Sequence, residues 1–119
     1  MHELSVCQAL IDQVARVARE QRAARVSVIH VSVGPLSGIE PQLLEQAYPL
    51  AAAGSLAEDA DLCIESAPIR VYCDQCDKES TATASRLVCA DCGNWRTTLV
   101  SGDELLLTHV ELFREQAHV

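Results

Sequence analysis

Four cysteines are the residues of this chain whose types and spacing point most directly to chemistry. They form two Cys-x-x-Cys pairs, Cys73 with Cys76 and Cys89 with Cys92, and twelve residues separate the pairs. Each pair turns the backbone so that both thiolates point the same way, and two facing pairs make a tetrahedral four-sulfur site. Zinc prefers that geometry and those ligands. The spacing therefore predicts a structural zinc site held by these four cysteines.

The same cysteines leave three other interpretations open. A redox protein would use a Cys-x-x-Cys pair as a low-pKa thiolate, although the second pair at zinc-ribbon spacing argues against this. Four thiolates also bind iron, as in rubredoxin. A zinc-ribbon adaptor would bind proteins or nucleic acid and carry no second metal. The two remaining cysteines, Cys7 and Cys63, have apolar neighbours, and we expect both in the core.

The first three residues, Met1-His2-Glu3, form a second group that could bind a metal ion. The α-amine, the next backbone amide and the His2 imidazole can chelate one ion, and nitrogen donors in a plane suit Ni(II) or Cu(II). Glu3 adds a carboxylate or another backbone nitrogen. By itself this short pattern has little specificity. We expect the two histidines that lie in predicted strands, His30 and His109, to be packed or hydrogen-bonded.

Composition excludes several classes of function. The chain has 119 residues and a formal net charge of −8, and its only lysine is Lys78, which argues against nucleic-acid binding. It has no GxxxxGK[ST] loop and no recognisable nucleophile–base arrangement, so we do not expect an enzyme. No signal peptide and no apolar run of about 18 residues is present. We therefore expect a cytoplasmic protein with reduced cysteines and no membrane contact.

Periodicity predicts the elements that must position these groups. Apolar residues at helical spacing indicate a first helix, and a run rich in β-branched residues indicates a strand after it. A second helix is expected from Glu40-Pro41, with a kink or early end at Pro49, and the next strand should have an edge or bulge at Pro68. The predicted elements are a helix over 3–22, a strand over 25–33, the second helix from about 40, and strands over 61–71 and 104–113.

This order predicts an α+β fold in which two helices cover a three-stranded sheet and a zinc-ribbon-like domain is inserted. We expect the first domain to comprise residues 1–72 plus 96–119, and the zinc-binding domain to comprise residues 73–95. The inserted segment is too small for a core of its own. Metal binding should supply its folding free energy, on the order of 10 kcal/mol.

Several blocks resemble the HypA/HybF family of hydrogenase nickel-incorporation proteins. The opening Met1-His2-Glu3-Leu4-Ser5 is similar to the family's first residues, and Gly34 to Pro41 (GPLSGIEP) resembles its loop before the second helix. Leu62 to Glu65, the two cysteine pairs with Gly93, and Gly102 to Leu105 are similar to its later blocks. Together they span nearly all of the chain in the same order.

The resemblance implies a nickel metallochaperone with a structural Zn(II) site and a transferable Ni(II) ion. Family members work with a GTPase, HypB, and the large-subunit precursor of [NiFe]-hydrogenase; some relatives serve urease. The resemblance places the nickel ligands at His2 with the backbone nitrogens of Met1 and Glu3, and an acidic residue near the site at Glu40. A plain helix cap is the alternative for Glu40. The sequence leaves open whether the chain forms a homodimer and which enzyme receives the nickel.

Overall fold

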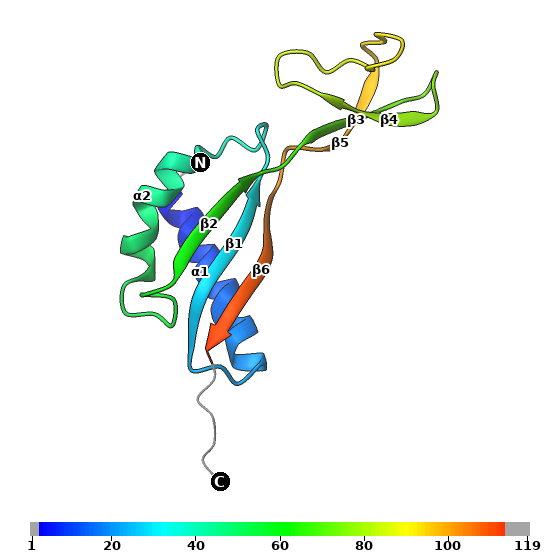
Figure 1. Cartoon of the computed structure of the whole chain (residues 1–119). Helices are drawn as coiled ribbons and strands as arrows, with labels where there is room; N and C mark the ends of the chain where they lie inside the picture. The colour runs from blue at the N-terminus through cyan, green and yellow to red at the C-terminus, as the bar shows by residue number, and fades with distance from the viewer. Residues whose placement is uncertain (1–2, 114–119) are drawn as a thin grey trace. The chain divides into compact units, whose positions relative to one another are not determined.

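The structure is a computed structural model, and it describes residues 3–113. Within these residues, two helices and six strands form an α+β fold with two three-stranded sheets, in the strand orders β2-β1-β6 and β4-β3-β5 (Figure 1). The elements are α1 (Glu3–Glu20), β1 (Arg25–Val33), α2 (Pro41–Ala52), β2 (Asp61–Ser66), β3 (Ile69–Cys73), β4 (Lys78–Ala82), β5 (Thr97–Ser101) and β6 (Leu105–Phe113). Neither helix of this described part of the chain has the length and apolar character that crossing a lipid bilayer demands.

The chain divides into two compact units. The first unit contains the described residues up to 31, residues 40–64 and those from 107 on; the second unit contains residues 32–39 and 65–106. Both helices therefore belong to the first unit, and all four cysteines of the two Cys-x-x-Cys pairs belong to the second.

Helix α1 forms where the apolar spacing predicts it. Its buried residues recur at three- and four-residue intervals, while Glu3 in the first turn and Arg19 in the last turn are favourable to the helix dipole. The helix ends before Arg22, whose φ of 54° is left-handed. The buried residues of α1 are Cys7, Leu10, Ile11, Val14 and Ala18.

Helix α2 starts as predicted, with Glu40 as its N-cap residue and Pro41 in the first turn, where a missing N–H is harmless. It continues past Pro49 and ends at Ala52, where the N–H of Ala53 donates to the carbonyl of Pro49 over 3.1 Å. Pro49 has no N–H, so one preceding carbonyl lacks its helical partner. The helix ends within one turn after Pro49.

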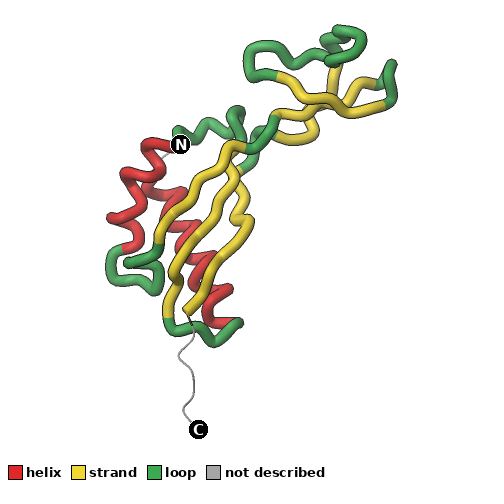
Figure 2. The backbone as a smooth tube through the Cα atoms, in the orientation of Figure 1, coloured by secondary structure: helices red, strands yellow, loops and turns green. Residues whose placement is uncertain are grey.

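The core of the first unit lies between the two helices and the sheet. The Cys7 thiol donates to the carbonyl of Leu44 over 3.5 Å, which joins α1 to α2, and Ile29 and Val31 of β1 are fully buried. In Figure 2 no helix of the described chain lies in front of this sheet. Residues of β1 and β6 that point away from the core are therefore partly open to solvent.

The strand expected over 61–71 is wrong in its extent. The structure ends β2 at Ser66, before Pro68, and starts β3 at Ile69, in the other sheet. Proline has no N–H for a ladder, and the neighbouring Ala67 N–H donates to Val33 over 3.0 Å, so the chain leaves one sheet and enters the next here.

The expectation that Cys63 lies in the core is also wrong. Cys63 is exposed, whereas its neighbours Leu62 and Ile64 are half-buried. Because successive side chains of a strand point to opposite faces, the apolar neighbours of Cys63 turn inward and Cys63 turns outward. Cys7, by contrast, is fully buried as expected.

Two glycine-containing blocks meet within the second unit. The N–H of Gly34 donates to the carbonyl of Glu104, and the N–H of Leu36 donates to the carbonyl of Gly102, both over 2.8 Å. A Cβ at position 34 would collide with the carbonyl of Gly102. The backbones thus approach more closely than any side chain at position 34 would allow.

Candidate metal centre

The first cysteine pair lies at the end of the central strand of its sheet. Cys73 is the last residue of β3 and pairs with Lys78 of β4 and Thr97 of β5. Cys76 lies in the turn between β3 and β4, and the next residue, Asp77, adopts a left-handed φ of 51°. Aspartate tolerates this conformation better than most residues, so it can close a tight turn behind Cys76.

The second pair repeats this turn. Gly93 follows Cys92 with a φ of 74°, and its N–H donates to the carbonyl of Cys89 over 2.9 Å. The loop is anchored to β4, because the N–H of Ala90 donates to Ser80 Oγ over 3.1 Å and Lys78 forms an ion pair with Asp91. The two loops are thereby held facing one another.

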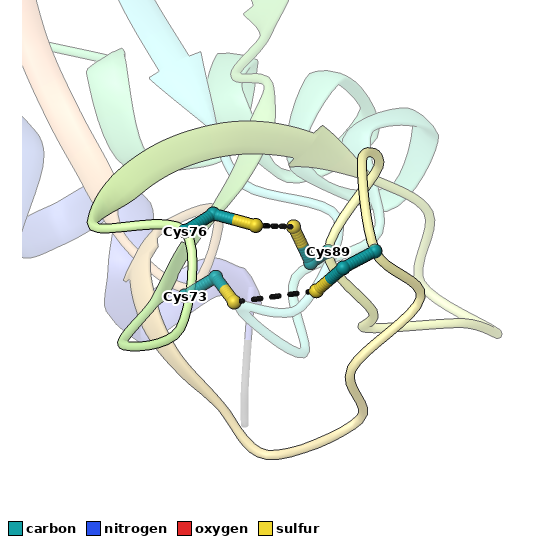
Figure 3. Close-up of side chains that lie close together, drawn as sticks. Cys73, Cys76 and Cys89 are labelled. Carbon is teal, nitrogen blue, oxygen red and sulfur yellow. Dashed lines mark hydrogen bonds between the residues drawn. The ribbon is translucent and has the colours of Figure 1, made fainter.

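The four sulfurs converge on one point. Cys73 Sγ lies 3.7 Å from Cys92 Sγ, Cys89 Sγ lies 3.8 Å from Cys76 Sγ, and all four sulfurs are within 4.8 Å of one another. Figure 3 shows Cys73, Cys76 and Cys89 turned toward a common centre from the two loops.

These separations fit zinc. A tetrahedron of thiolates about 2.3 Å from a zinc ion has sulfur–sulfur edges of about 3.8 Å. A disulfide would need sulfurs only about 2.05 Å apart, and all six cysteines are free. The donors and their spacing thus form a tetrathiolate site that would hold a zinc ion in a closed shell of four sulfurs.

The backbone prepares the first cysteine of each pair for metal binding. The N–H of Cys76 is the main cause that lowers the pKa of the Cys73 thiol, and the N–H of Cys92 is the main cause that lowers the pKa of Cys89 to about 6. Hydrogen bonding to Cys92 and Cys89 raises the pKa of Cys76 to about 12. A divalent cation would replace the protons that the sulfurs otherwise share.

Asn94 is a further residue that the sequence did not single out. Its side-chain N–H group donates to Cys73 Sγ over 3.9 Å, and its backbone carbonyl accepts from the N–H of Cys89 over 3.0 Å. Donors to a ligating sulfur orient it and tune the metal. Only its position two residues after Cys92 could have indicated this role.

The predicted nickel residues are described only in part. Met1 and His2 lie outside the described residues. Glu3 is the first residue of α1 and is half-buried. Glu40 is exposed, and its side chain makes no capping hydrogen bond; its carbonyl accepts from the N–H of Leu44 over 3.0 Å. Glu40 is thus the N-cap residue of α2, and it caps the helix through its backbone carbonyl and not through its side chain.

The chain matches a sequence profile over residues 1–112, and the profile is described as hydrogenase/urease nickel incorporation, metallochaperone, HypA. The chain belongs to this family. The match covers the start of the chain, both glycine blocks and both cysteine pairs, so the resemblance stated from the sequence is confirmed.

Individual members of the HypA family support the assignment. The chain is 48% identical over 112 residues to the hydrogenase maturation factor HypA of Nitrosospira multiformis, covering 94% of this chain and 97% of the relative. It is 38% identical to the factor of the same name from Aquifex aeolicus over the same shares of both chains. It also resembles the solution structure of the Ni metallochaperone HypA from Helicobacter pylori, with a TM-score of 0.74 and 26% identity over 97% of this chain and all of the other.

Proposed function

We propose that this protein carries nickel during the maturation of [NiFe]-hydrogenase, binding Ni(II) with its first residues. The observation that carries the proposal is that the family match begins at residue 1, with Met1-His2-Glu3 as its first residues. The relatives named hydrogenase maturation factor HypA support the hydrogenase as the destination.

The chemistry of these residues suits Ni(II). The α-amine has a pKa near 7.7–8.0, so a useful fraction is neutral at physiological pH, and the His2 imidazole is a strong ligand for nickel. Glu3 opens α1, and the first N–H groups of a helix have no partner within the helix. The Glu3 amide nitrogen can therefore join the chelate without breaking the helix. Glu40, exposed at the start of α2, is the acidic residue we assign to the neighbourhood of the nickel.

The tetrathiolate site has the opposite role in this proposal. Four thiolates fill the tetrahedral positions of zinc and leave none for a substrate or a transferable ion. Zinc would hold the second unit in the shape that a partner recognises, and we propose a HypB-type GTPase and the hydrogenase large-subunit precursor as those partners. The activity is transfer and not catalysis. Because thiolate ligands persist in a reducing compartment, we place it in the cytoplasm.

A comparison of three proteins tests the terminal chelate. Nickel affinity and zinc content are measured for the parent, for His2→Ala, and for a version with extra residues ahead of Met1, with any purification tag at the carboxyl end. We expect both changes to weaken nickel binding at least tenfold, while each protein retains one zinc ion.

Equal nickel affinity in all three proteins would show that the terminal chelate is wrong. It would also favour the zinc-ribbon adaptor, for which Met1, His2 and Glu3 are dispensable. Adding His109→Ala to each protein keeps the measurement confined to the amino-terminal site, because His109 lies in a second group of residues that could hold a metal ion.

A further inference from the structure

Three side chains with metal-binding atoms gather on the solvent-exposed face of the first unit. His30 comes from β1, and His109 and Glu111 come from the neighbouring strand β6. One ligand atom from each of the three lies within 4.8 Å of the others. The three residues are separated widely in sequence from the cysteine site and belong to the other compact unit.

The strand pairing fixes this group in place. Thr108 Oγ1 donates to the carbonyl of His30 over 3.1 Å, and Ser27 Oγ donates to the carbonyl of Glu111 over 3.0 Å. Both contacts tie β1 to β6 at the backbone of a cluster residue. Sites carried by paired strands hold their side chains more precisely than sites on loops.

The spacing of the ligands along β6 puts two of them on the same face. His109 and Glu111 are two residues apart in this strand, so their side chains point the same way, and both are exposed. The neighbouring strand β1 adds His30 beside them.

The distances suit a metal ion with nitrogen and oxygen ligands. His30 Nε2 lies 3.1 Å from Glu111 Oε2, and the rings of His30 and His109 lie 5.2 Å apart between centroids at 54°. Two ligand atoms, each about 2.1 Å from one ion, lie about 3.0–3.4 Å apart at octahedral or tetrahedral angles. The His30–Glu111 pair already has this spacing, and a rotation of the exposed His109 ring can bring in the third ligand.

A hydrogen bond between His30 and Glu111 accounts for two members of the cluster but not for the third. Among the described residues, His109 contacts His30 through its ring and makes no side-chain hydrogen bond. The side chains are 28% exposed for His30 and 51% for Glu111, so an ion and its remaining water ligands can reach them. The formal charge of −8 also favours the approach of a cation.

We propose that His30, His109 and Glu111 form a further metal site, which takes a divalent late first-row ion such as Ni(II). Two imidazoles and one carboxylate suit this class of ion and do not suit a soft monovalent one. Three protein ligands leave coordination positions for water, so the ion exchanges readily. The site thus differs from the closed tetrathiolate, and it shares no residue with the amino-terminal chelate.

The test uses the zinc-loaded full chain with extra residues ahead of Met1, so that the terminal chelate is absent. Nickel binding is measured by calorimetry and by metal analysis after dialysis against NiCl₂. We expect one equivalent of nickel in addition to the zinc. His109→Ala and Glu111→Gln should each weaken it at least tenfold, since loss of even an outer-shell partner costs 10–100-fold.

Glu65→Gln is the matched control, because it removes an exposed carboxylate from β2 and should leave nickel binding unchanged. Broadening of the His30 and His109 ring proton resonances by Cu(II) gives a second readout of the same site. The proposal is overturned if the extended protein binds no nickel beyond its zinc, or if both ligand changes leave the affinity within twofold. Neither result bears on the terminal chelate, because the extended variant used in this test lacks it.

Discussion

The close contact between Gly34 and Gly102 predicts how single substitutions at glycine positions change the stability of the second unit. Gly34→Ala should destabilise the second unit by about 2 kcal/mol or more, because the new Cβ would collide with the carbonyl of Gly102 and force the two blocks apart. Gly38→Ala is the control, since its φ of 79° is strained for alanine but its Cβ would meet nothing within 4 Å. It should cost only about 1 kcal/mol.

Urea unfolding of both zinc-loaded variants, followed by circular dichroism, measures the difference. Equal losses of stability in the two variants would mean that the blocks can separate freely. The sequence marked both blocks through their glycines, but it could not show that they touch. That contact joins residues almost seventy positions apart through backbone hydrogen bonds, which leave no pattern in side-chain types.

The residues that the sequence located best are those whose function depends on local spacing. The two cysteine pairs could be recognised because each metal loop is built within four consecutive residues. The cluster of His30, His109 and Glu111 could not, since it depends on the pairing of β1 with β6, two strands that lie far apart in the sequence. The prediction that Cys63 is buried failed for a related reason. Its apolar neighbours indicate that one face of the strand is buried, but the side chain of Cys63 points to the opposite face.

At the scale of elements, Tyr48 holds α2 to the segment that follows it. The residue is buried, and its hydroxyl donates to the carbonyl of Ala57 over 2.9 Å. Burial, helped by the neighbouring Cys7 and Asp61, raises the pKa of Tyr48 to about 12 from 10. The folded state therefore keeps its proton at a pH where the unfolded chain loses it.

The sign of the pH dependence follows from this. Below pH 10 both states are protonated and the full stability is present; between pH 10 and 12 the unfolded chain ionises first, so stability falls by up to about 2 kcal/mol. Tyr48→Phe should lose about 1 kcal/mol at neutral pH and show less of the alkaline decline. Urea titrations from pH 8 to about 12 compare the two proteins. A parallel decline in the parent and Tyr48→Phe would contradict the assignment.

The elements themselves were largely predictable, and the exceptions have a common cause. Both helices and the strand over 25–33 follow directly from periodicity. The strand over 61–71 failed because its apolar pattern continues across Pro68 while its hydrogen-bond partners change from one sheet to the other. Which strand pairs with which is a property of the tertiary fold, and the pattern within one segment does not encode it.

At the scale of the whole molecule, the two units are stabilised by different means. The first unit buries a continuous set of apolar residues from both helices and β1, among them Leu10, Val14, Ile29 and Leu44. The second unit buries few large side chains, chiefly Ile69 and Val71, and we therefore expect its folding to depend on metal binding. Removal of zinc should therefore unfold the second unit and leave the helical first unit folded.

Counting reactive thiols tests this division across all six cysteines. In the zinc-loaded protein only the exposed Cys63 should react with a thiol reagent, because zinc protects four cysteines and Cys7 is fully buried. A strong chelator should raise the count from one to five, and urea should then expose Cys7 as the sixth. Cys63→Ser should abolish only the first step. If the chelator exposed all six thiols at once, the first unit would depend on zinc as well, and the two units could not be treated as separately stabilised.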